Sequence, residues 1–145
     1  EEFDFILDIN LRGAFLMATE VGRHLLERKS GAIVNIDSLN TYAPLKGVLP
    51  YAISKAGVSM MTRGMAMEWG DRHVRVNAIA PGLTLVEATE YVPKDRHDLY
   101  VNGRAMRREQ MPEDVTGAVM FFLSDAASFV TGQLLPLNGG FVMNN

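Results

Sequence analysis

Residues 32–38 read Ala-Ile-Val-Asn-Ile-Asp-Ser, an apolar run that ends in an acid and a serine. Short apolar runs of this kind are typical of parallel strands that are covered on both faces. Tyr51 follows Ser38 by thirteen residues, and Lys55 comes four residues after Tyr51. The sequence from 51 to about 70 predicts a helix, in which positions four apart lie on one face. We therefore expect Ser38, Tyr51 and Lys55 to meet beyond the end of this strand.

The tyrosine and lysine predict a proton-transfer site. A tyrosine hydroxyl has an ordinary pKa of about 10 and is a poor acid or base near neutral pH. An ammonium one helical turn away favours the phenolate, so we expect Lys55 to lower the pKa of Tyr51. The hydroxyl of Ser38 could orient the same substrate oxygen. Taken alone, a Tyr-x-x-x-Lys pair more often lies on a helix surface, and Ser38 is equally consistent with a turn.

The rest of the chain alternates between helix and strand patterns. The expected elements are a helix over residues 3–28 with apolar side chains on more than one side, a strand over 73–80 ended by Pro81-Gly82, a lid with short helices over 83–110, a helix over 112–124 and a strand over 133–137. Pro136 inside the last strand indicates the edge of a sheet, because proline cannot donate a ladder hydrogen bond.

This order of elements predicts an α/β fold with a doubly wound parallel sheet and right-handed crossovers, in one domain. Ligands of such sheets bind beyond the carboxyl ends of the strands. Ser38 follows the first strand, and Pro81-Gly82 follows the second. Both should therefore lie on one rim of the sheet, next to the helix that begins near Tyr51.

Composition excludes several classes of function. The chain has 145 residues, 48% apolar residues, a net charge of −3 and no cysteine. We expect no nucleic-acid or membrane partner, no disulfide and a cytoplasmic location. The sequence G-x-S-x-G, typical of many hydrolases, does not occur, and the three histidines are isolated, so we expect no metal site.

Two surface features leave alternatives open. The helices over 3–28 and 51–70 carry more apolar residues than one buried stripe needs. Either both are enclosed in a core, or they meet a partner subunit in a homodimer or homotetramer. Arg104, Arg107 and Arg108 form a basic cluster that is more often a solvated face than a phosphate site.

The chain resembles the compact single-domain branch of the short-chain dehydrogenase/reductase family along its whole length. The matching stretches are Asp8-Ile9-Asn10-Leu11, Ile33 to Ser38, Tyr51-Ala52-Ile53-Ser54-Lys55-Ala56, Val76-Asn77-Ala78-Ile79-Ala80-Pro81-Gly82, Thr131-Gly132-Gln133 and Asn138-Gly139-Gly140. The resemblance implies an NAD(P)-dependent oxidoreductase that interconverts a small-molecule secondary alcohol and a ketone by hydride transfer.

The resemblance also implies a catalytic tetrad of Asn10, Ser38, Tyr51 and Lys55. Tyr51 would donate or accept the proton, Lys55 would also bind the nicotinamide ribose, Ser38 would hold the substrate oxygen, and Asn10 would position a water. Without the resemblance we would regard Asn10 as an ordinary polar helix residue.

The same resemblance makes the turn after the second strand a cofactor-binding element. Pro81 and Gly82 would form the edge of the nicotinamide pocket, and Thr84 would contact the carboxamide through its backbone. Taken alone, Pro81-Gly82 is consistent with a plain turn that ends a strand.

The sequence departs from the family pattern in three ways. Asp37 stands where the family often has a small hydroxyl residue, and Val86 stands where many members have threonine. The glycine-rich turn G-x-G-x-x-G, which binds the pyrophosphate in this family, is absent. We therefore expect residues 1–145 to be the C-terminal, catalytic part of a Rossmann-like domain. The glycine-rich half and the residue that selects NAD or NADP would lie outside this sequence.

Two other functions remain open from the sequence. The tyrosine and lysine could serve an epimerase or dehydratase, although such proteins usually carry a further substrate domain. Alternatively, the 145 residues alone are catalytically silent and act only in folding or association, through an unpaired strand edge.

Overall fold

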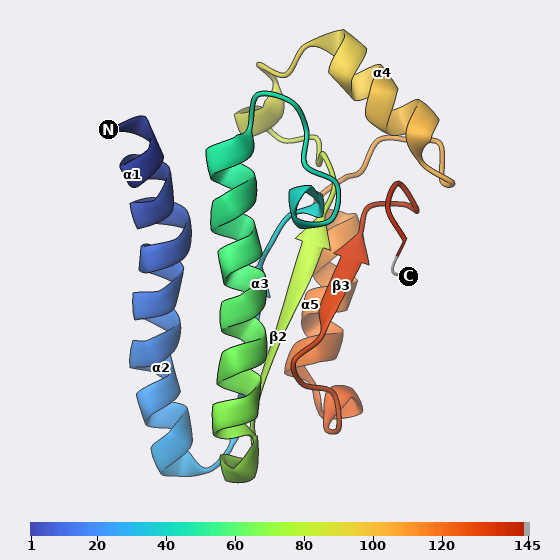
Figure 1. Ribbon diagram of the computed structural model, residues 1–145. Helices are drawn as coiled ribbons and strands as arrows, with labels where there is room; N and C mark the ends of the chain where they lie inside the picture. Colours follow the sequence, from blue (N-terminus) through green and yellow to red (C-terminus); the bar gives the residue numbers. More distant parts are fainter. Residues whose placement is uncertain (144–145) are drawn as a thin grey trace.

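The computed structural model describes residues 1–143, and within them three parallel strands form one sheet (Figure 1). The strands are β1 (Gly31–Ile36), β2 (Val74–Pro81) and β3 (Leu134–Leu137), in the order β1-β2-β3. The predicted α/β class and parallel sheet are confirmed. Pro136 pairs with β2 from β3, which lies at an edge of this sheet, as expected for a residue without an N–H group.

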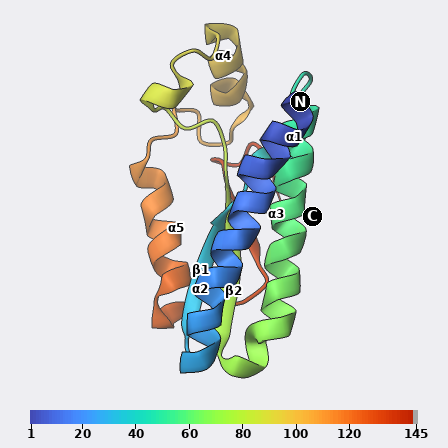
Figure 2. The ribbon, with the colours of Figure 1, turned by 90° about the vertical axis from the view of Figure 1, so that its left-hand side faces the viewer.

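Helices cover both faces of the sheet. They are α1 (Glu2–Leu7), α2 (Ala14–Arg28), α3 (Leu49–Trp69), α4 (Lys94–Gly103) and α5 (Glu113–Leu123). Figure 2 shows α2 and α3 on one face of the sheet and α5 on the other. The helix α4 lies beyond the end to which β2 points, where the sequence predicts a lid (Figure 1). The predicted helix over residues 3–28 is present, but a π-helical turn, Asp8–Gly13, interrupts it.

The two faces of β2 bury different layers of the core. Val74 and Val76 are fully buried against α3, while Ile79 faces the other way and packs with Phe122 of α5. Because side chains alternate along a strand, one strand can anchor both layers. The approach of α2 to α3 requires glycine, since a Cβ at Gly22 would lie 2.5 Å from the ring of Trp69.

The outer faces of α2 and α3 carry exposed apolar side chains. Within α2 only Ala18 and Gly22 are buried, and the side chain of Met17 is 67% exposed. Met67 of α3 is 86% exposed. Within residues 1–143 the sheet covers only one side of each helix, so the apolar residues on the other side are exposed. No helix within residues 1–143 is both long and apolar enough to cross a membrane.

Candidate active site at the carboxyl ends of β1 and β2

Parallel pairing brings the ends of β1 and β2 to one rim of the sheet. Ile36 is in register with Ile79, and the amide of Asp37 continues the ladder by donating to the carbonyl of Ile79 at 2.8 Å. Ser38 therefore follows β1 at the level where β2 ends with Pro81. The backbone pairing thus puts Ser38 and the Pro81-Gly82 turn on one rim of the sheet, as the sequence predicts.

Ser38 lies at the start of a tight turn. Its backbone is extended, with φ of −154°, and it caps the short 3₁₀ helix Leu39–Thr41. The Ser38 hydroxyl accepts hydrogen bonds from the backbone N–H of Asn40 at 3.2 Å and from its side-chain amide at 3.3 Å. The side chain is 6% exposed, so its oxygen is held in one place at the rim.

Tyr51 and Lys55 lie in the first two turns of α3, which begins with Pro50 in its first turn, a position that proline favours. The ammonium of Lys55 donates to the carbonyl of Ile36 at 2.9 Å and lies 5.7 Å from the centre of the Tyr51 ring. Lys55 thus connects the start of α3 to the end of β1. The three side chains predicted to meet beyond this strand do so.

The acidity of Tyr51 differs from the sequence-based expectation. Burial raises the pKa of Tyr51 above 10, a hydrogen bond with Ser38 opposes this shift, and the charges of Asp37 and Tyr91 add to it. Burial also lowers the pKa of Lys55, while Asp37 acts in the other direction. The expected lowering of the Tyr51 pKa by Lys55 is therefore wrong for this chain. Desolvation disfavours the phenolate more strongly than its polar neighbours favour it.

Asn10 reaches the same region from the π-helical turn. Its side-chain amide donates to the hydroxyl of Ser54 at 3.3 Å, and this hydroxyl donates to the carbonyl of Tyr51 at 2.7 Å. Asn10 and Lys55 also line a groove of about 410 Å³ between this turn and β1. π-Helical turns occur frequently at functional sites, because they displace a side chain from the regular helix pattern.

The side chain of Gln110 and the backbone of β3 hold the turn after β2. The amide of Gly82 donates to the carbonyl of Leu137 and to the side-chain oxygen of Gln110, both at 3.1 Å. The amide of Gln110 donates in turn to Leu137 at 2.7 Å. A Cβ at Gly82 would lie 3.0 Å from the Gln110 oxygen and 3.3 Å from the guanidinium of Arg104. The turn therefore suits glycine, and it is fixed from outside the strand.

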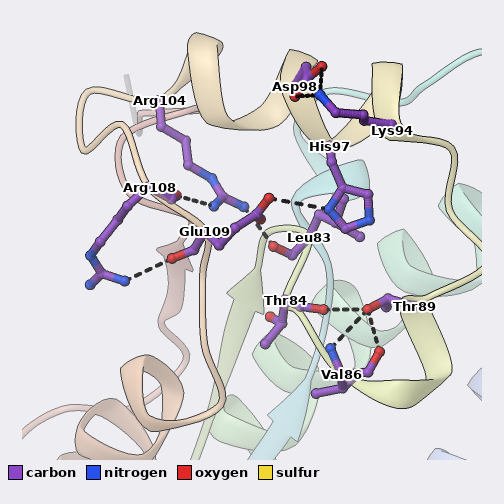
Figure 3. Close-up of polar contacts among 10 residues, drawn as sticks. All are labelled: Leu83, Thr84, Val86, Thr89, Lys94, His97, Asp98, Arg104, Arg108 and Glu109. Atoms are coloured by element: carbon purple, nitrogen blue, oxygen red, sulfur yellow. Dashed lines mark hydrogen bonds and ion pairs between the residues drawn. The ribbon is translucent and has the colours of Figure 1, made fainter.

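Thr84 continues this turn into the lid segment, residues 83–110. Its carbonyl accepts a hydrogen bond at 2.8 Å from the hydroxyl of Thr89, which also bonds the backbone of Val86 (Figure 3). Val86 stands where many family members have threonine, and the hydroxyl of Thr89, three residues later, bonds the backbone in this stretch of the lid.

Arg104 fastens the lid segment to the turn. It donates to the carbonyl of Leu83 at 2.7 Å and to that of Arg108 at 2.9 Å (Figure 3), and it is 3% exposed. Burial lowers its pKa. Arg108 instead forms two 2.6 Å bonds with Asp114, and Arg107 is exposed. The interpretation of these arginines as one solvated basic face is therefore wrong for Arg104.

Several polar residues of this rim have no clear signal in the sequence. Gln110 contacts Gly82 across 28 positions, and Asn40 and Ser59 act through turns and helix packing. Within residues 1–143, no three histidine, aspartate or glutamate side chains are grouped so that they could hold a metal ion.

Comparisons with known proteins identify the family. A family model described as Enoyl-(Acyl carrier protein) reductase matches residues 1–142. The 3-oxoacyl-(acyl-carrier-protein) reductase FabG of Rickettsia felis is 36% identical over 143 residues, which are 99% of this chain and 59% of that protein. The chain belongs to the short-chain dehydrogenase/reductase family.

Solved structures agree with this assignment. A short-chain type dehydrogenase/reductase from Mycobacterium ulcerans superposes with a TM-score of 0.93 at 30% identity, over 96% of this chain and 51% of that one. A gluconate 5-dehydrogenase from Burkholderia cenocepacia, in complex with NADP and tartrate, gives 0.93 at 30% identity, over 97% and 56%. The chain thus spans little more than half the length of these relatives.

Replacing Arg104 with methionine should destabilise the protein by about 1–3 kcal/mol, because the carbonyls of Leu83 and Arg108 would lose a buried donor. The exposed neighbour Arg107, changed to methionine, should stay within about 0.5 kcal/mol of the wild type. Urea unfolding of the complete protein measures both variants. Equal stability of the two variants would contradict the anchoring role of Arg104.

Proposed function

We propose that this chain is the catalytic part of an NAD(P)-dependent oxidoreductase that interconverts a secondary alcohol and a ketone. The observation that carries the proposal is the convergence of Ser38, Tyr51 and Lys55 at the end of β1. Lys55 lies 2.9 Å from the carbonyl of Ile36 and 5.7 Å from the Tyr51 ring centre. Family membership supports the same reaction class, with a small molecule as the substrate.

Tyr51 is the proposed proton donor in the direction of ketone reduction. Because burial raises its pKa, its hydroxyl is protonated near neutral pH and can give the proton to a carbonyl oxygen. The Ser38 hydroxyl, fixed by the turn that follows it, would bind and orient the same oxygen. In the reverse direction, Tyr51 would accept the proton of the alcohol.

Lys55 and the turn after β2 are the proposed cofactor contacts. An ammonium has three N–H donors, and among the described residues Lys55 uses one of them, toward Ile36, so it could bind ribose hydroxyls with the others. Pro81, Gly82 and the backbone of Thr84 would form the nicotinamide edge. NAD or NADP, when bound, would donate or accept the hydride.

The dinucleotide pyrophosphate requires residues that this sequence does not contain. The family's glycine-rich turn is absent from the 145 residues. We propose that this part of the site lies outside the sequence, together with the residue that selects NAD or NADP.

Asn10 is the proposed fourth member of the site and would hold a water for proton exchange. Its side-chain amide donates to the hydroxyl of Ser54, which donates in turn to the backbone carbonyl of Tyr51. We also propose a cytoplasmic location.

Changing Tyr51 to phenylalanine in the complete protein should lower kcat for ketone reduction by about 10²–10⁴-fold, because the proton donor is lost. Lys55→Met should also reduce turnover and should weaken cofactor binding. Lys29→Met, at the opposite end of β1, is the matched control and should keep wild-type rates. Steady-state kinetics with a panel of ketones and both cofactors measures these effects. Near-normal turnover of the Tyr51 variant would refute its role.

The exposed apolar faces of α2 and α3 support a homodimer or homotetramer. Ile53, Met60 and Met67 are 43%, 64% and 86% exposed. Their spacing of seven residues, or two helical turns, puts them on one stripe of α3. Figures 1 and 2 show α2 running beside this helix, and α2 carries exposed apolar side chains of its own, such as Met17. A second copy of the chain would bury these side chains.

Met67→Glu should shift the complete protein toward monomers, because association would bury an unpaired carboxylate. Phe129→Glu places the same charge on a fully exposed side chain in the loop after α5, so it should leave the assembly unchanged. Sedimentation velocity reports the mass of each variant. A monomeric wild type, or a Met67 variant that assembles normally, would contradict this interface.

A further inference from the structure

Asp37 is a buried carboxylate between the end of β1 and the proposed proton donor. It is 3% exposed, and its amide donates to the carbonyl of Ile79, so its backbone belongs to the sheet. Ionised aspartates are rarely buried so completely unless several donors surround them. Its partners therefore indicate what it does there.

Three donors from two segments, the Ser38 turn and α3, converge on this carboxylate. The backbone N–H of Ser38 lies 2.8 Å from Oδ1, the hydroxyl of Thr41 lies 2.7 Å from the same oxygen, and the hydroxyl of Ser59 lies 2.6 Å from Oδ2. The group thus ties β1, the Ser38 turn and α3 together. Because all three partners donate to the carboxyl oxygens, this arrangement fits the ionised carboxylate, which only accepts.

The charge of Asp37 also reaches the titratable groups around it. Burial is the main cause of the raised pKa of Tyr51 and of Tyr42, and the charge of Asp37 adds to it. At Lys55, burial lowers the pKa and the charge of Asp37 opposes this shift. Tyr91 of the lid segment is a further titratable neighbour of Tyr51. The pKa of Asp37 is itself raised by burial, and its three hydrogen bonds and the charge of Lys55 act in the opposite direction.

We propose that Asp37 is a positioning residue of this site. It holds Ser38 by accepting a hydrogen bond from the backbone N–H of that residue, and its negative charge adds to burial in favouring the phenol of Tyr51 and opposes burial in favouring the ammonium of Lys55. This inference rests on the proposed function for its catalytic meaning. A phenol is the form that donates a proton to a carbonyl. The charge of Asp37 therefore keeps Tyr51 in its proton-donating form up to a higher pH.

Asp37→Asn tests the charge while keeping the shape. The asparagine oxygen can still accept from Ser38 and Thr41, and its amide can donate to the Ser59 hydroxyl. Without the negative charge, the pKa of Tyr51 should fall, because a nearby negative charge disfavours the phenolate. Oxidation requires the phenolate, so its rate should begin to rise at a lower pH. Reduction requires the phenol, so its rate should begin to fall at a lower pH.

The titration is measured in the complete protein by the ultraviolet absorbance of phenolate. Subtracting the signal of the matching Tyr51→Phe variant isolates Tyr51 in each background. Asp71→Asn removes an exposed acid just before β2, at the other end of the sheet, and should shift nothing. This measurement needs no turnover. If the complete protein reduced none of the ketones, the proposed function would be refuted, and the titration of Tyr51 would still test the role of Asp37.

Asp37→Ala tests the positioning. It removes all three hydrogen bonds, so kcat should fall by about tenfold or more beyond any effect of the asparagine variant. An unchanged titration of Tyr51 in Asp37→Asn would overturn the electrostatic half of the proposal. Wild-type kcat in folded Asp37→Ala, or equal losses in the alanine and asparagine variants, would overturn the positioning half.

Discussion

The parallel pairing of β1 with β2 is the constraint on which the rest of this rim depends. Register places Ile36 opposite Ile79, so the chain leaves both strands at the same level. The residues that directly follow the two strands therefore lie at the same rim: Ser38 after β1, and Pro81 and Gly82 at the end of β2. The helix α3 begins at this rim, with Tyr51 and Lys55 in its first two turns, and then runs back along one face of the sheet (Figure 1). A register shift of one residue would turn Ser38 to the opposite face of the sheet.

Burial and charge compete at Tyr51, and burial prevails in this chain. Burial of its hydroxyl disfavours the phenolate, which raises its pKa. Lys55 donates one hydrogen bond from its ammonium to the carbonyl of Ile36, and this bond fixes the start of α3 against β1. The lysine therefore acts here through geometry, and the tyrosine remains a phenol that is suited to giving up a proton to a bound carbonyl. The acid–base balance of such a site is a property of its packing as much as of its residue types.

The sequence predicted the elements better than the contacts between them. Apolar runs located β1 and β2, and the four-residue spacing of Tyr51 and Lys55 put them on one helix face. The π-helical turn at Asn10 was not predictable, because it differs from a regular helix by only a few backbone bonds. Gln110 and Arg104 act on backbone groups 28 and 21 positions away, which no local pattern encodes. The direction of the Tyr51 shift depends on desolvation, a result of tertiary packing. The roles of the tetrad residues stay predictions.

A crystal structure of the complete protein with its oxidised dinucleotide and an unreactive ketone is the most direct test of this site. The account predicts that the ketone oxygen lies within about 2.6–3.2 Å of both the Ser38 and Tyr51 hydroxyls. It also predicts that Lys55 faces the ribose and that the Pro81-Gly82 turn borders the nicotinamide. A ketone bound elsewhere, with the Tyr51 hydroxyl beyond hydrogen-bonding reach of its oxygen, would contradict the account.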